Sequence, residues 1–289
     1  MKKIKIFSGI ALLSLLFTSC EDVIQVKLDE GSKLLVVDAF INDLRIDQKV
    51  KLSYTDAYFS NTNPPPVTNA EVTLNDITAG KTYTFVHAGN GEYLYPLGLD
   101  TIAYINHSYK LEVLYEGISY TSYTTQKRTT VIDSIQAKKT EEKNIQQKEG
   151  YICTLWARDV PGPVKDYYWI KAFRNDVLFN QGSQINVAID AASGAGADGF
   201  IFTPPIARGI TPFGEVYKKF DKCRVEIHSI SETTYNFLLQ VISQTTNSGL
   251  FATTPENVKT NINTPNGSPL KAIGWFNMAS VSAMEKIVQ

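Results

Sequence analysis

The stretch Leu-Leu-Val-Val-Asp-Ala-Phe-Ile, residues 34–41, decides the fold class that we expect for this chain. It is apolar, rich in β-branched residues and followed at once by the turn pair Asn42-Asp43, a combination that predicts a β-strand. Residues 49–54 alternate polar and apolar side chains, as a strand with one solvated face does. These two stretches predict a core built from a β-sheet.

Further along the chain, the same signals predict a series of short strands at residues 70–74, 82–86, 92–95, 108–115 and 119–124. Turn residues separate them, among them Asn90-Gly91, a pair typical of tight hairpins. Many short strands with closely spaced turns are typical of an immunoglobulin-like β-sandwich, which we expect over residues 34–126.

The rest of the chain, residues 127–289, is expected to form a second, β-rich domain. Strands are predicted at residues 131–135, 151–157, 167–173, 215–220 and 223–230, a loop at 138–150, and a last short element at 284–288. One amphipathic helix is expected after Ser231, a good N-cap. Its apolar residues recur at helical spacing: Tyr235, Leu238, Leu239 and Ile242.

The first residues predict export and a lipid anchor. Three lysines precede an apolar run at residues 6–17, which is too short to span a bilayer and suits a signal peptide. The following Thr18-Ser19-Cys20 resembles the lipobox of bacterial lipoproteins. We therefore expect a signal peptide at 1–19, lipidation of Cys20 with acyl chains such as palmitate, and a lipidated tether at 20–33. The alternative is that Cys20 is an ordinary small residue of an N-terminal helix.

The composition of the chain indicates which partners to expect and whether its cysteines can form a disulfide. The 28 basic and 29 acidic residues give a net charge of −1 and no basic patch, so nucleic acid is not an expected partner. Besides Cys20, the chain contains Cys153 and Cys223. An exported compartment permits a disulfide between these two, and the alternative is a pair of separate buried thiols.

No motif predicts catalysis, a cofactor or a metal site, so we expect a protein that is not an enzyme. Residues 194–199 match G-x-G-x-x-G, but two prolines soon follow where a dinucleotide site needs a helix. The three histidines lie far apart in the sequence: His87, His107 and His228. The many tyrosines of the first domain, among them Tyr93 and Tyr123, suggest either packing in the sheet or a binding face.

Short motifs resemble those of known exported proteins. Asp100-Thr101-Ile102 and Asp133-Ser134-Ile135 resemble an O-glycosylation acceptor of exported Bacteroidetes proteins, so Thr101 and Ser134 are candidate modification sites. Five segments, in order, resemble the domain-of-unknown-function 4249 family of Bacteroidetes lipoproteins: residues 35–41, 66–74, 91–93, 132–135 and 255–276. The order of the first segments also resembles a prealbumin-like β-sandwich.

The family resemblance implies a location and a role, and supplies no catalytic residues. It implies an outer-membrane lipoprotein, on the periplasmic or the cell-surface face, often encoded beside a TonB-dependent receptor. We therefore expect a lipid-anchored binding or accessory protein that partners such a receptor in uptake. The alternatives are a structural or adhesin-like surface module and, less favoured, a cell-envelope hydrolase.

Overall fold

The computed structural model describes residues 31–57, 60, 62–98, 101–140, 149–190, 199, 210–247 and 257–289. Cys20, the predicted signal peptide and most of the predicted tether lie outside these residues. The described chain is mainly β, as predicted, and its single α-helix is α2 (Glu232–Thr245). In this part of the chain, no helix has the length and hydropathy needed to cross a membrane.

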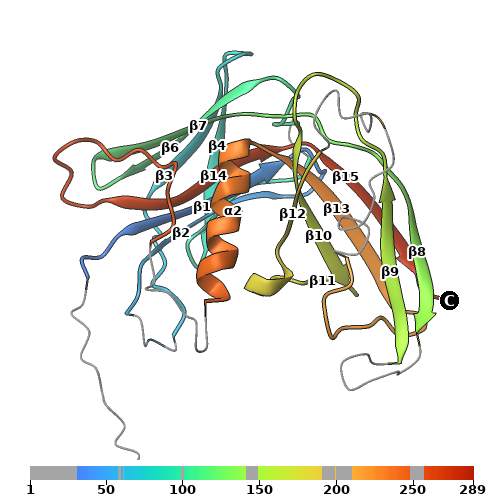
Figure 1. Cartoon of the computed structure of the whole chain (residues 1–289). Helices are drawn as coiled ribbons and strands as arrows, with labels where there is room; N and C mark the ends of the chain where they lie inside the picture. The colour runs from blue at the N-terminus through green and yellow to red at the C-terminus, as the bar shows by residue number, and fades with distance from the viewer. Residues whose placement is uncertain are drawn as a thin grey trace, which may run out of the picture. The chain divides into compact units, whose positions relative to one another are not determined.

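Eight strands form the first sheet, in the order β14-β1-β2-β5-β4-β3-β6-β7 (Figure 1). Neighbouring strands are antiparallel except for β1 and β14, which run parallel. The sequence predicts seven of these strands and misses β14, which comes from the far end of the chain. The bounds are β1 (Leu35–Asn42), β2 (Gln48–Tyr54), β3 (Glu71–Asp76), β4 (Lys81–Gly89), β5 (Glu92–Tyr95), β6 (Ser108–Tyr115), β7 (Ile118–Thr125) and β14 (Ala272–Ala279).

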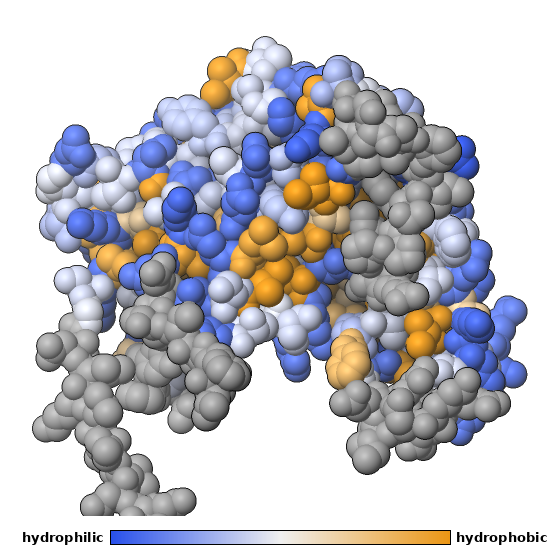
Figure 2. Space-filling model, viewed as in Figure 1, coloured by the Kyte–Doolittle hydropathy of each residue, from blue (hydrophilic) through white to orange (hydrophobic). Residues whose placement is uncertain are grey.

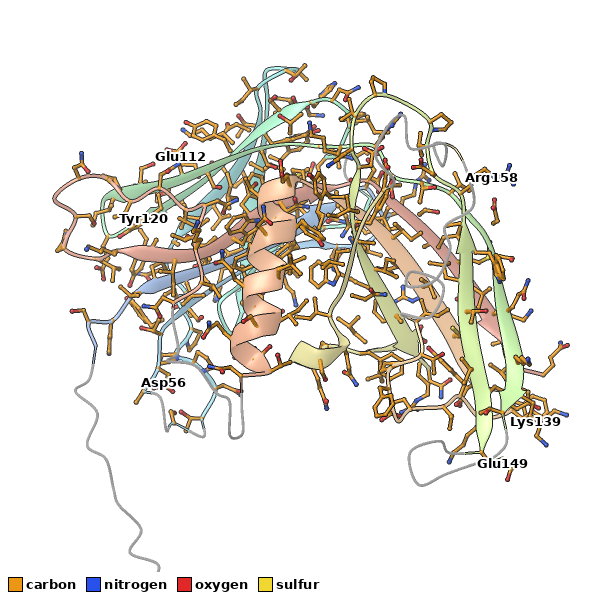
Figure 3. The ribbon with its side chains drawn as sticks, in the orientation of Figure 1. Asp56, Glu112, Tyr120, Lys139, Glu149 and Arg158 are labelled. Atoms are coloured by element: carbon orange, nitrogen blue, oxygen red, sulfur yellow. The ribbon has the colours of Figure 1, made fainter. Side chains whose placement is uncertain are left out.

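The first sheet nearly closes, because the segment before β14 attaches to β7. The Tyr120 hydroxyl, on β7 in Figure 3, donates a hydrogen bond of 2.9 Å to the Leu270 carbonyl. Thr121 and Asn263 exchange two backbone hydrogen bonds of 3.2 and 2.7 Å. The strands that we predicted to form a sandwich thus lie in one continuous sheet. The assignment of an immunoglobulin/prealbumin-like fold to them stays a prediction. Alternate side chains fill its core, among them Val37, Leu52, Leu74, Leu111 and Phe276.

The second part contains a five-stranded sheet and a separate two-stranded hairpin. In the larger sheet the order is β11-β10-β13-β15, and β12 also pairs with β10. The hairpin β8-β9 shares a hydrophobic core with it, and an ion pair of 3.7 Å joins Lys139 to Glu149 near the hairpin's tip (Figure 3). The bounds are β8 (Ile132–Thr140), β9 (Gly150–Ala157), β10 (Tyr167–Arg174), β11 (Val177–Leu178), β12 (Asn186–Ile189), β13 (Lys222–Ile230) and β15 (Val281–Ile287).

Two local predictions for the second part are wrong. Residues 215–220 form turns, with a single bridge between Tyr217 and Tyr151, because the chain reverses direction twice in this short stretch. The loop predicted from Lys138 begins later, since β8 continues to Thr140 and pairs with β9. Cross-strand pairing there overrides the polar composition of the segment.

One long strand crosses from the first sheet to the second at Ser280. Residues before it pair with β1, and residues after it pair with β13. Ser280 is buried; its amide donates to the Ser229 hydroxyl at 2.8 Å, and its hydroxyl accepts from Gln126 at 2.9 Å. The predicted division into domains at residues 34–126 and 127–289 falls at this junction, and it stays a prediction. Strand β14, which belongs to the predicted second domain, completes the sheet formed by the strands of the predicted first domain. Residues Lys33–Gln289 form one compact unit.

The parallel pair β1-β14 depends on a glycine. Gly274 has φ +114°, and a Cβ at this position would overlap the carbonyl oxygen of Val37 on β1. We expect Gly274→Ala to lower the free energy of unfolding by about 1–3 kcal/mol, because alanine adds both backbone strain and a clash. Urea unfolding followed by circular dichroism measures the change.

Gly31→Ala is the matched control, since nothing lies within 4 Å of the Cβ it would add. It should leave stability unchanged. Equal urea midpoints for the two variants would show that the close approach of β1 and β14 is not a constraint.

Candidate functional site

A groove of about 680 Å³ runs along α2. Polar side chains of one helix face form one wall, an extended segment at residues 259–261 forms the other, and aromatic rings lie at the base. Figure 2 shows that hydrophobic residues lie directly beside hydrophilic ones on the surface around α2. The lining residues are Tyr123, Thr233, Asn236, Phe237, Leu239, Gln240, Ser243, Lys259, Thr260, Asn261 and Trp275.

The helix that forms the groove begins as the sequence predicts. The Ser231 hydroxyl caps it by accepting from the Thr234 amide at 3.1 Å, and Glu232 lies in the first turn, where negative charge suits the helix dipole. Leu238 of the predicted apolar face is buried, but Leu239 is 41% exposed and lines the groove. The predicted apolar face is therefore only partly a packing face.

The base of the groove is an aromatic pair that joins α2 to β14. The rings of Phe237 and Trp275 stack with centroids 4.3 Å apart and an interplanar angle of 14°. The Trp275 indole donates to the Thr234 hydroxyl at 2.9 Å, and that hydroxyl donates to the side-chain Oδ1 of Asn277 at 3.0 Å. Because Thr234 and Asn277 are buried, these bonds fix the position of the indole.

The opposite wall is held to the same strand. The Asn261 amide group exchanges two hydrogen bonds with the Phe276 backbone, at 2.8 and 2.9 Å, and the Thr260 hydroxyl donates to the Gly274 carbonyl. The Gln240 side chain accepts from the Lys259 amide at 3.0 Å and closes the wall onto the helix. Among the described lining residues there is no carboxylate, so the groove suits a neutral or anionic ligand with hydrogen-bonding groups.

Sequence reasoning missed this groove, because its parts come from β7, α2, β14 and residues 259–261. The one signal was the excess of tyrosine. Most of those tyrosines pack in the first sheet, as Tyr93 and Tyr109 do, whereas Tyr123 is 57% exposed on the rim of the groove. Packing in the sheet is therefore confirmed for the buried tyrosines, and a binding role for Tyr123 stays a prediction.

The three histidines lie apart, and two have structural partners. His107 is 2.7 Å from the Asp76 carboxylate at one end of the first sheet. His228 lies on β13, 2.8 Å from Glu226, whose other oxygen contacts Arg224 at 2.8 Å. Burial lowers the pKa of His228 to about 4, so it is neutral at neutral pH. His87 lies on β4, with its ring near that of Tyr93.

Lys171 of β10 lies beside this buried ion cluster. It stands opposite Glu226 on β13, and its amine lies 4.1 Å from the centre of the Trp169 ring. Burial lowers the pKa of Lys171 to about 8 and raises the pKa of Asp38 on β1. Since charges from both sheets meet here, the cluster helps to fix the second sheet against β1.

The remaining predicted positions stay separate from the groove. Thr101 is exposed and lies at a smaller cavity of about 350 Å³ near the β1-β2 turn, and Ser134 is half-buried on β8. Glycosylation of either residue stays a prediction. Of the glycine motif at 194–199, the structure describes only Gly199. No group of three or more His, Cys, Asp or Glu residues in the described ranges is arranged to hold a metal ion.

Three buried carboxylates meet near the start of β10. Arg128 binds Asp166 at 2.7 Å, and the Asp166 amide donates to Asp190 at 3.1 Å. Asp159 accepts from the Gly199 amide at 3.1 Å. One oxygen each of Asp159 and Asp190 is buried without a hydrogen-bond donor. Burial and the neighbouring carboxylates raise the pKa of Asp190 from 3.8 to about 6, which favours its protonated form in mildly acidic solution.

The two cysteines of the predicted disulfide face each other from β9 and β13. Both are fully buried and their thiols are free in this structure. The Cys153 thiol hydrogen-bonds with that of Cys223, and this contact, together with burial, raises the pKa of Cys153. Their pairing in the oxidised protein stays a prediction that this proximity supports.

The architecture is that of a mainly β protein with a nearly closed sheet and a groove under its one described helix. The chain belongs to the family described as Domain of unknown function (DUF4249), whose model matches residues 21–285. The predicted family membership is therefore confirmed. No curated protein matches the sequence.

The raised pKa of Asp190 predicts a pH dependence of stability. Because the folded pKa of Asp190 is raised, its contribution to the free energy of unfolding falls as pH rises from about 4 to about 6, and stays low above that. We expect Asp190→Asn to be more stable than the wild type above pH 6, by about 1–2 kcal/mol, and equally stable near pH 4. Thermal unfolding across this pH range measures the difference.

Glu71→Gln, at an exposed position of β3, is the control and should follow the wild-type profile. A constant difference between Asp190→Asn and the wild type at every pH would contradict the raised pKa of Asp190.

The facing thiols predict a disulfide on oxidation. Diamide, a thiol oxidant, should accept the two thiol protons and two electrons, and the new S–S bond should raise the free energy of unfolding by about 2–4 kcal/mol. Peptide mass spectrometry identifies the Cys153–Cys223 link. Cys153→Ala is the control and should gain no stability; two thiols that remain free to alkylate after treatment and denaturation would refute the pairing.

Proposed function

We propose that this chain is a lipid-anchored binding or accessory protein of the outer membrane, which binds its ligand in the α2 groove and partners a TonB-dependent receptor in uptake. In this proposal Cys20 carries the lipid, and the chain binds its ligand without catalysing a reaction. The observation that carries the proposal is the groove, whose base is the rigid Phe237–Trp275 pair.

The chemistry of the groove supports binding. An aromatic base supplies apolar contact, and hydrogen-bonding groups on both walls supply orientation, as in small-molecule sites. The Asn236 side chain and the Lys259 amine line the groove and are available to a ligand. A base that is already ordered loses little conformational freedom on binding, which favours affinity.

The proposal is tested by isolating the native lipoprotein from its own membranes in mild detergent. We expect an N-terminal peptide that begins at an acylated Cys20, a TonB-dependent receptor in the same fraction, and a small molecule that mass spectrometry detects after denaturation. Asn236→Trp should fill the groove and lose the small molecule while keeping the lipid.

Val86→Trp is the matched control, because Val86 is 64% exposed on β4, outside the groove lining. It should retain the small molecule. An intact Met1 would refute the anchor, the absence of the receptor would refute the partnership, and equal retention by both variants would refute the groove as the binding site.

A further inference from the structure

The most exposed large hydrophobic side chains of the described chain gather at one end of the second sheet. Four exceed the rest in exposed fraction: Phe213 at 87%, Phe220 at 72%, Val131 at 71% and Val177 at 69%. Three of these four, all except Val131, lie on the loop 210–221 and at the start of β11, at the end of the sheet where β11 lies (Figure 1).

Hydrogen bonds hold these two segments together. The Asn175 side chain of the turn donates to Asp221 at 2.8 Å and accepts from the Lys222 amide at 2.8 Å. The Phe220 amide donates to the Val288 carbonyl at 2.7 Å. Arg174 contacts Glu215 at 2.9 Å. The exposed side chains are therefore carried by an ordered surface.

Phe220 is held in a conformation that bulky residues avoid. Its φ is +72°, in the left-handed region, yet its ring points into solvent and gains little from packing. The Lys219 amine lies 5.2 Å from the centre of this ring. An exposed aromatic ring on a strained backbone indicates that the residue contacts something other than this chain.

The surroundings favour a lipid surface over a protein. Neither of the two cavities described above includes any of the three apolar side chains, whereas the central anchor residues of a protein interface lie in well-packed pockets. Two lysines, Lys218 and Lys219, precede Phe220 in the sequence. Aromatic residues beside lysines are typical of surfaces that lie in the membrane interface, where the amines meet anionic headgroups.

We propose that this end of the second sheet, carrying Phe213, Phe220 and Val177, inserts into the interface of an anionic phospholipid bilayer. The inference rests on the proposed anchor, because a tether at residues 20–33 spans at most about 45 Å and keeps the folded chain beside the membrane. Contact at this end then sets which face of the protein, and which opening of the α2 groove, is presented away from the bilayer.

The test uses the full lipoprotein in phosphatidylethanolamine–phosphatidylglycerol vesicles whose acyl chains are brominated. Bromine quenches tryptophan that enters the bilayer. We expect the added fluorescence of Phe213→Trp and of Phe220→Trp to be quenched, and that of Val131→Trp, an equally exposed control, to persist. Quenching at neither loop position, or equally at all three, would overturn the proposal.

A second measurement separates this contact from the anchor. Both hydrophobic cores lie within Lys33–Gln289, so a chain that begins at Glu21 retains them without the lipid. Its binding to the same vesicles should fall about tenfold with Phe213→Ala or Phe220→Ala and be unaffected by Val131→Ala. If the loop variants bind unchanged, the surface proposal fails even where the lipoprotein itself stays anchored; specific recovery of a receptor through Phe220 would also overturn it.

Discussion

The buried polar chain at the crossing strand is the interaction on which the rest of the structure depends. Ser229 and Ser280 exchange hydrogen bonds where β14 ends and β15 begins, and the Gln126 side chain joins them from the end of β7. Asn277 of β14 extends this series of hydrogen bonds to Thr234 of α2. Because unpartnered polar groups are costly when buried, these residues fix the two sheets and the helix in one arrangement.

The groove is a consequence of that arrangement. Trp275 lies on β14 and Phe237 on α2, so their stacked rings exist only when the helix is positioned by Thr234. The wall at residues 259–261 is tied to the backbone of β14 as well. A single strand thus completes the first sheet, supplies the base of the groove and continues into the second sheet.

Local signals in the sequence predicted the β class, seven strands of the first sheet and the capped helix, since alternation and capping involve neighbouring residues. They could not predict β14, whose partner β1 lies at the other end of the chain and whose Gly274 is unfavourable in an ordinary strand. The groove was hidden for the same reason, because Tyr123, Phe237 and Trp275 are brought together only by the tertiary fold. The sequence left open whether Cys153 and Cys223 pair, and only the structure brings their thiols into contact.

The parallel pairing of Leu35 with Ala272 has a consequence for how the protein is made. Until synthesis has passed residue 279, one edge of β1 has no partner, and that edge belongs to an apolar strand that other chains could join. Pairing so distant in sequence is also slow to form. Self-association before synthesis is complete is therefore the failure to which this topology exposes the chain.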